Sequence, residues 1–179
     1  RVIEQYLSGP LYVRLEISRL LLRDLFRVMP LAVIATLIVV AAGFRHWHGV
    51  VLPLASNAIA LVLTLLAFQA AGHSLNYVTV ILPPTIYVVG FAYAIHVVSD
   101  FDRNLIRLGD QTQAVKAALS ECAIPVTLTA LTTAIGFASL TISSIDSIRI
   151  FGLYASLGTV LAWLCALLVV PAGLQVCRD

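Results

Sequence analysis

Charged residues are scarce in this sequence. Of its 179 residues only 11% are charged and 60% are hydrophobic, and the mean hydropathy is +0.99. Soluble domains average about a quarter charged and about half apolar residues. Water could not solvate a surface with so little charge, so we expect lipid to be the surrounding medium. The formal net charge of +2 is small and scattered, which argues against nucleic acid as a partner.

The sequence also lacks the motifs of catalytic and metal sites. Its three cysteines, Cys122, Cys165 and Cys177, form no C-x-x-C pair, so we interpret them as small apolar side chains. No nucleophile–base pair, metal-ligand cluster or phosphate loop is recognisable, and we expect no enzyme activity, no metal and no cofactor. The chain begins at Arg1 without a signal-peptide pattern, so we interpret it as a piece of a longer protein.

Long apolar runs are abundant. A helix needs about 20 apolar residues to cross a bilayer, and backbone groups in hydrocarbon must be hydrogen-bonded within the segment. The short loops between the runs indicate antiparallel neighbours. The expected fold is an all-α polytopic membrane bundle over residues 29–179, with five transmembrane helices at about 29–44, 49–71, 76–99, 123–143 and 150–176. Pro30 suits the first turn of the first span.

Two further segments are amphipathic. Residues 11–28 interleave leucines with arginines, and residues 101–121 form a charged bridge between the third and fourth spans. Both patterns fit helices that lie along the membrane interface. For the first segment, packing on another domain is an equally good interpretation. We expect residues 1–28 to connect the bundle to a preceding extracytoplasmic domain.

The third span carries polar side chains on one side. Tyr93, His96 and Asp100 fall within an arc of about 60° on a helix. Ionisable residues inside a membrane suggest function because burying them is costly. Asp100 lies at the end of the span, where its side chain can reach water. The imidazole of His96 is either a neutral group satisfied by a hydroxyl or a group that titrates near neutral pH.

The fourth span has a polar face as well, formed by Thr129, Thr132, Thr133 and Gly136. Threonine hydroxyls bond to their own helix or across to a neighbour, and small residues let helices approach closely, so tight packing alone also explains this face. We expect helix contacts at Gly90, Gly136, Gly152, Ser156 and Gly158.

The two adjacent prolines of the third span, Pro83 and Pro84, each lack a backbone donor. Inside a helix they would kink it or open it locally. Broken helices are common where transporters bind or move, although a static bundle tolerates them too. We therefore predict a kink at this point.

Several stretches together resemble a known family. The sequence "GFAYAIHVVSDFDR" in the third span precedes "TALTTAIGFASL" in the fourth, and "IRIFGLYASLGTVLAWLCALLVVPAGL" follows in the fifth. In this order they resemble the membrane half of resistance–nodulation–division (RND) superfamily permeases. The nearest branch is that of the MMPL-like and hydrophobe/amphiphile exporters, which are related to sterol-sensing domains.

The resemblance implies that the five spans are the second to sixth of a six-helix half, with a second half of the parent chain as partner. It implies proton-driven export of hydrophobic or amphiphilic substrates by a multi-pass protein of the bacterial inner membrane. Many relatives carry a proton-binding aspartate before the tyrosine of the third span. Here that residue is Ala92, which cannot titrate.

From these observations we hypothesise a polar lining near the bundle centre. Tyr93 and His96 would form it, with Thr129, Thr132 and Thr133 in support. The titrating group would be His96 or an acidic residue of the second half. The alternative function is a non-transporting module that senses or scaffolds lipids, which the loss of the aspartate favours. Membrane lipids are expected partners in either case, and a homo-oligomer stays open.

Overall fold

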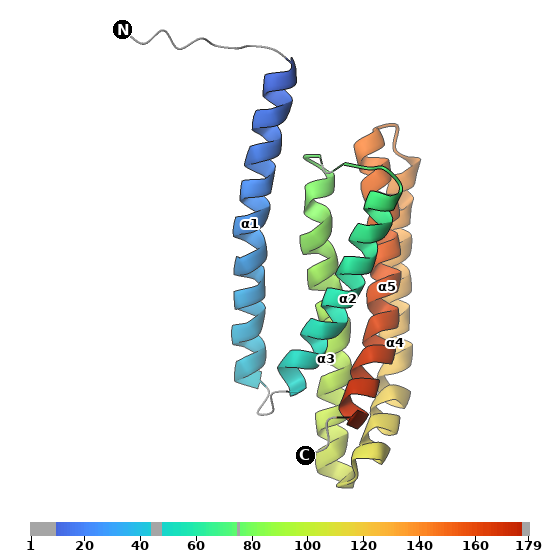
Figure 1. The fold of residues 1–179 in the computed structure, drawn as a ribbon. Helices are drawn as coiled ribbons and strands as arrows, with labels where there is room; N and C mark the ends of the chain where they lie inside the picture. The colour runs from blue at the N-terminus through green and yellow to red at the C-terminus, as the bar shows by residue number, and fades with distance from the viewer. Residues whose placement is uncertain (1–9, 44–47, 75, 177–179) are drawn as a thin grey trace, which may run out of the picture.

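The computed structural model describes residues 10–43, 48–74 and 76–176, and the remaining positions lie outside the described chain. The described residues form helices joined by short connections (Figure 1). Their order is α1 (Pro10–Gly43), α2 (His48–Ala70), the 3-10 turn η1 (Thr79–Ile81), α3 (Leu82–Leu108), α4 (Gln111–Ser139), the 3-10 turn η2 (Leu140–Ile142) and α5 (Asp146–Val176). The predicted all-helical class is therefore confirmed for these residues.

Four of the helical segments in the described chain are long and apolar enough to cross a membrane. They are Gly49–Ala70, Thr79–Leu108, Gln111–Ile142 and Asp146–Val176. The first predicted span, 29–44, falls in α1, where the apolar stretch Leu25–Ile38 is shorter. Residue 44 of that span, and residues 1–9 of the expected connector, lie outside the described residues. A fifth crossing stays a prediction.

α1 differs from the sequence-based expectation. The amphipathic segment 11–28 and the span 29–44 were expected as separate helices, with Pro30 opening the second, but one helix runs from Pro10 to Gly43 with Pro30 inside it. Between Pro10 and Pro30 the sequence contains no glycine or turn signal that would end a helix. A single proline costs one backbone hydrogen bond, and this is tolerated where neighbouring groups can compensate.

The expected bridge helix over residues 101–121 does not exist as a separate element. α3 continues to Leu108, and α4 begins at Gln111. Gly109 ends α3 in the left-handed conformation with φ 67°, and Asp110 caps α4 by accepting a hydrogen bond from the Gln113 amide at 2.7 Å. The combined segment Thr79–Leu108 has 30 residues and is about 45 Å long at 1.5 Å per residue, more than the hydrocarbon core needs. The charged residues lie on these long helix ends.

The two adjacent prolines begin a helix instead of kinking one. Asn76 and Thr79 form a reciprocal cap, in which the Asn76 side chain accepts from the amides of Val78 and Thr79 at 3.0 Å. The Thr79 hydroxyl accepts from the Asn76 amide at 2.8 Å. Pro83 and Pro84 follow in the first turn of α3, where a missing backbone donor costs nothing. The predicted kink was wrong.

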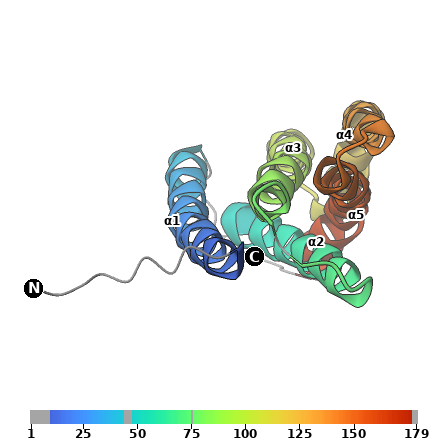
Figure 2. The ribbon, with the colours of Figure 1, turned by 90° about the horizontal axis from the view of Figure 1, so that it is seen from above.

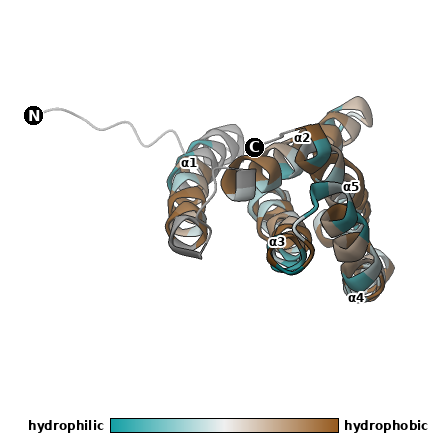
Figure 3. Cartoon of the chain, turned by 90° about the horizontal axis from the view of Figure 1, so that it is seen from below, coloured by the Kyte–Doolittle hydropathy of each residue, from teal (hydrophilic) through white to brown (hydrophobic). Residues whose placement is uncertain are grey.

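The core is made largely of small residues. α5 packs against α2, α3 and α4, and the contacts include alanines such as Ala94, Ala118 and Ala162. A second cluster surrounds Phe68 and Tyr154 at the other end of α5. Large apolar side chains such as Leu66, Val88 and Leu168 are instead exposed on the outside. Figure 3 shows that hydrophobic residues, in brown, recur along the described helices. This inverted distribution suits helices that associate by close packing within lipid.

Three of the expected contact glycines lie in tight contacts. A Cβ at Gly90 would stand 2.3 Å from Asn57 Oδ1, one at Gly152 would stand 2.6 Å from the Leu140 Cβ, and one at Gly158 would stand 2.5 Å from Ile86 Cδ1. Gly136 differs, because nothing lies within 4 Å of the corresponding point and the residue is exposed. Ser156 is half-buried. Close helix approach therefore holds for Gly90, Gly152 and Gly158, whereas a side chain at Gly136 would meet open space.

α1 stands apart from the other helices. Its contacts within the described chain are few and involve α2, α3 and η1, and Figure 2 shows it separated from α4 and α5. Leu31, Ile34 and Ile38 on its surface are exposed. The remaining four long helices form the compact part of the molecule.

Candidate functional site

A cleft of about 290 Å³ opens between α3 and α4. It combines an apolar floor with ionisable and hydroxyl-bearing side chains, on an outer face that is otherwise mostly apolar. The residues lining it are Ala92, Tyr93, His96, Asp100, Glu121, Cys122, Pro125, Val126 and Thr129. Residues 92–100 belong to α3 and residues 121–129 to α4, so the antiparallel pairing of the two helices creates the site.

Tyr93 is the most deeply placed polar residue of the cleft. Its side chain is 3% exposed, and its hydroxyl has no hydrogen-bond partner among the described residues. Thr133 lies near the phenol, but the contact does not have hydrogen-bond geometry. A buried polar atom without a partner is uncommon in folded proteins, because its lost hydration is not replaced.

His96 lies differently from the expectation. It lines the same cleft as Tyr93, but on the exposed side of α3, and Ala92 is exposed as well. Tyr93 and His96 are about 60° apart around the helix, which is enough to bury Tyr93 and expose His96. The structure therefore brings Tyr93 and His96 to one cleft, but it places His96 on the exposed side of α3 and not near the centre of the described bundle.

The threonines of α4 direct their hydroxyl hydrogens to their own helix. Thr129 donates to the Pro125 carbonyl at 2.9 Å, Thr132 to that of Leu128 at 3.0 Å, and Thr133 to that of Thr129 at 2.7 Å. Of the three, Thr129 alone lines the cleft, while Thr132 is exposed beside it. Their oxygens can still accept a hydrogen bond, but their hydrogens are already engaged.

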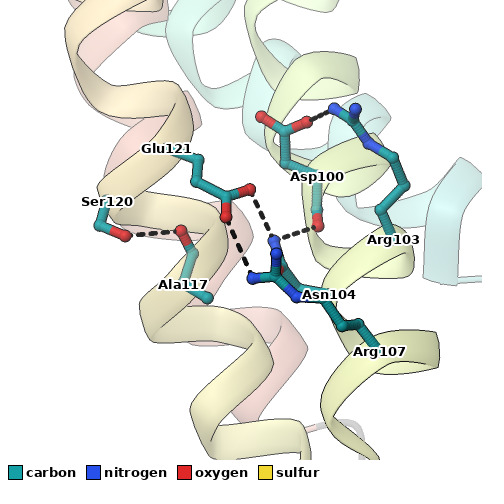
Figure 4. Close-up of polar contacts among 7 residues, drawn as sticks. All are labelled: Asp100, Arg103, Asn104, Arg107, Ala117, Ser120 and Glu121. Atoms are coloured by element: carbon teal, nitrogen blue, oxygen red, sulfur yellow. Dashed lines mark hydrogen bonds and ion pairs between the residues drawn. The ribbon is translucent and has the colours of Figure 1, made fainter.

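The end of the cleft nearest the α3–α4 turn is closed by an amide and two ion pairs (Figure 4). Asn104 is 2% exposed, and its Nδ2 donates to Glu121 Oε2 at 2.9 Å and to the Asp100 carbonyl at 3.0 Å. Arg107 pairs with Glu121 Oε1 at 3.2 Å. Arg103 forms an ion pair with Asp100. We call this arrangement the carboxylate mouth.

Two residues of the carboxylate mouth were missed as site residues. Glu121 and Asn104 were both included in the expected bridge at residues 101–121 and were not predicted to belong to a site. The signal for Asn104 was available, because it continues the face of α3 that carries Tyr93, Val97 and Asp100 at helical spacing. Recognising it required knowing that α3 continues past residue 99. Asp100, expected to meet water, instead has a side chain only 14% exposed.

Pro125 adds a backbone feature to the cleft. In an α-helix the amide of residue 125 would donate to the carbonyl of residue 121, but proline has no N–H. The Glu121 carbonyl therefore lacks its usual helical donor, and both residues line the cleft. Within the described ranges, no group of three or more His, Cys, Asp and Glu side chains is arranged to hold a metal ion.

Comparison with known proteins identifies the family. The sequence model of the MMPL family matches residues 3–177, which is nearly the whole chain. The chain belongs to the MMPL family. The resemblance to RND-type permeases is thereby confirmed. The chain is an RND-like membrane domain of an integral multi-pass protein, and the members of the MMPL family are transporters. Neither the curated proteins nor the solved structures contained a match.

Membership of the MMPL family gives the cleft a context. The position at which the resemblance leads us to expect an aspartate, Ala92, lies within the cleft beside Tyr93. The titratable side chains that share the cleft with it are His96, Asp100 and Glu121, along with the phenol of Tyr93 and the thiol of Cys122. The site retains ionisable groups although the aspartate is missing.

Proposed function

We propose that this MMPL-family domain is half of a proton-driven exporter of hydrophobic or lipid-like substrates in the bacterial inner membrane. The observation that carries the proposal is the α3–α4 cleft, which gathers ionisable groups on an otherwise apolar face. Ionisable groups are expensive within a membrane, and they mark ion and substrate pathways in membrane proteins. Residues 1–28 would connect this domain to an extracytoplasmic domain that precedes it.

A second membrane half of the parent chain would cover the cleft. His96, Thr129 and Thr132 are exposed beside it, as is Gly136, whose surroundings are open. A face with small and polar residues packs well against another helix, and its hydroxyl oxygens can accept hydrogen bonds there. The second half would therefore lie along α3 and α4, with His96 at the interface and not inside this bundle.

The proton-carrying group would be His96 or an acidic residue of the second half. Ala92 cannot bind a proton, and His96 is one helical turn away in the same cleft. Histidine side chains change charge in the physiological pH range. At an exposed position that faces a partner helix, this charge would interact with groups of that helix. Tyr93 would orient the groups around the proton.

The test is gradient-driven transport by the full-length protein in liposomes with an imposed pH difference. We expect His96→Ala and Tyr93→Phe to reduce proton-driven efflux of a fluorescent amphiphile and to alter its pH profile. Tyr77→Phe, at an exposed tyrosine outside the cleft, is the matched control and should transport normally. Wild-type rates and pH profiles in both cleft variants would refute the proposed role of the cleft.

A non-transporting lipid-sensing or scaffolding module is the second candidate. The observation that favours it is Ala92, because the expected aspartate position carries no titratable group. The same assay separates the two functions. Substrate flux that stops when the proton gradient is dissipated supports export, whereas binding of lipid without any gradient-dependent flux supports sensing.

A further inference from the structure

We propose that the outer face of α1 binds an anionic phospholipid. Arg19, Arg23 and Arg27 would hold its phosphate group, and the exposed apolar side chains that follow them along α1 would lie against its acyl chains. This lipid would reside on the surface of α1 and would not be an exported substrate. Its binding therefore does not depend on the proposed export.

The three arginines form a stripe along one side of α1. All three are exposed, and they recur at every fourth residue. On a helix this spacing places them within an arc of about 80° and about 6 Å apart along the axis. None of them forms an ion pair with another described residue, whereas each arginine of α3 and α5 is paired with a carboxylate. The arginine stripe therefore presents positive charge that the described part of the chain does not neutralise.

The same side of α1 continues as an apolar surface. Phe26, Ile34 and Ile38 lie within about 20° of the arc of the arginine stripe, and the side chain of each is more than half exposed. A phospholipid has the same order, with a charged phosphate above apolar chains. Guanidinium groups suit phosphate oxygens because they can donate two parallel hydrogen bonds. An acidic protein segment would match the arginines but not the apolar continuation, so we favour a lipid.

The length of α1 places the arginine stripe at the level of the lipid phosphates. Residues 28–43 carry no charge and are about 24 Å long at 1.5 Å per residue, whereas the hydrocarbon core is about 30 Å thick. When an apolar segment is short, the flanking charged side chains extend back toward the headgroups. Arg27 borders this segment directly, so its guanidinium reaches the phosphates. Arg23 and Arg19 follow at intervals of about one turn.

The lipid preference of the full-length protein tests the site. The purified protein in mild detergent is titrated with phosphatidylglycerol or with phosphatidylcholine of the same acyl chains, and bound lipids are counted by native mass spectrometry. A basic residue near an anionic membrane surface contributes about fivefold in affinity. We expect the wild type to prefer phosphatidylglycerol and each single Arg→Gln variant to lose up to about fivefold of this preference. The combined variant Arg19→Gln, Arg23→Gln and Arg27→Gln should lose the preference, and an unchanged preference there would overturn the proposal.

Matched variants separate the loss of charge from a general loss of structure. Arg149 lies in the first turn of α5, at the same end of the molecule as the start of α1 (Figure 1), and is paired with Asp146 at 2.7 Å. Arg149→Gln should therefore keep the wild-type preference. Replacing the three arginines of the stripe by lysine keeps the charge and should keep most of the preference. An equal loss in the lysine and glutamine variants would refute recognition by charge.

A competition experiment distinguishes a lipid from a soluble anion. Glycerol 3-phosphate carries the phosphate but no acyl chain, so we expect it to leave phosphatidylglycerol bound at millimolar concentration. Complete displacement of the lipid would assign the arginines to a soluble anion and overturn lipid binding. Because no step of this measurement requires transport, a protein without gradient-driven efflux that still prefers phosphatidylglycerol would contradict export and support the lipid site. Efflux without the preference would contradict the lipid site alone.

Discussion

The side-chain amide of Asn57 on α2 donates a hydrogen bond to the backbone carbonyl of Tyr87 on α3, with a distance of 2.7 Å. Asn57 is 2% exposed, and its Oδ1 faces the point where Gly90 would carry a Cβ. The contact thus joins two helices through a group that has no other good partner in lipid. It fixes α3 about one turn before the residues that line the cleft.

Asn57→Ala should weaken the bundle, because it removes this interhelical hydrogen bond. Hydrogen bonds between membrane helices contribute about 0.6 kcal/mol on average and up to about 1.7 kcal/mol. We expect a loss in the free energy of unfolding within that range, measured by reversible unfolding in mixed micelles. Thr64→Ala is the control, since the Thr64 hydroxyl bonds to the Ala60 carbonyl of its own helix. A smaller loss for Asn57→Ala than for Thr64→Ala would contradict the prediction.

Gly90→Ala should be more damaging than Gly136→Ala. The added methyl at Gly90 would stand 2.3 Å from Asn57 Oδ1 and 2.9 Å from the Ala162 Cβ, whereas nothing lies within 4 Å at Gly136. Overpacking typically costs about 1 to 3 kcal/mol. The same unfolding measurement applies. Combining Gly90→Ala with Asn57→Ala should recover part of the loss, because neighbouring substitutions are not additive. Equal stability of the two alanine variants would argue against the close approach at Gly90.

Thr127→Val should release the indole of Trp163. The indole Nε1 donates to the Thr127 hydroxyl at 3.0 Å and joins α5 to α4. Valine keeps the shape of threonine but cannot accept a hydrogen bond, so the expected loss is about 0.6 kcal/mol. Indole fluorescence in a Trp47→Phe background, which leaves one tryptophan, reports the change of environment. Thr132→Val serves as the control, because its hydroxyl bonds within α4. An emission spectrum identical to that of wild type would count against the contact.

Pro125→Ala should strengthen α4. Alanine restores the backbone donor for the Glu121 carbonyl, and one hydrogen bond contributes about 1 kcal/mol net. We expect a gain of that order in the free energy of unfolding, measured by reversible unfolding in mixed micelles. Pro53→Ala, in α2 and away from the cleft, controls for the general effect of removing a helical proline. A loss of stability in Pro125→Ala would contradict the prediction.

The sequence was sufficient for the helical class, because apolar runs in lipid leave few alternatives to helices. It also brought Tyr93, His96 and Thr129 to one site. Spacing along a single helix, however, gives only the direction of each side chain around the helix axis. It does not tell whether another helix, lipid or water lies in that direction. This is why His96 was expected inside the bundle and is exposed.

Other differences have local causes that the sequence did contain. "LGDQ" at residues 108–111 holds a helix-ending glycine followed by a capping aspartate, yet the charge of the surrounding stretch suggested a single bridge. The cap formed by Asn76 and Thr79 shifts the helix start toward the prolines. The partners of Asn57 and Asn104 lie on other helices, so periodicity along one helix could not identify these two contacts.

The two-residue turn at Gly109 and Asp110 has a mechanical consequence. Gly109 ends α3 and Asp110 caps α4, so no flexible linker separates the two helices. Asn104 and Arg107 of α3 also bind Glu121 of α4. A displacement of either helix at this end would therefore displace the other. We therefore expect α3 and α4 to move as one rigid hairpin in any rearrangement of the bundle.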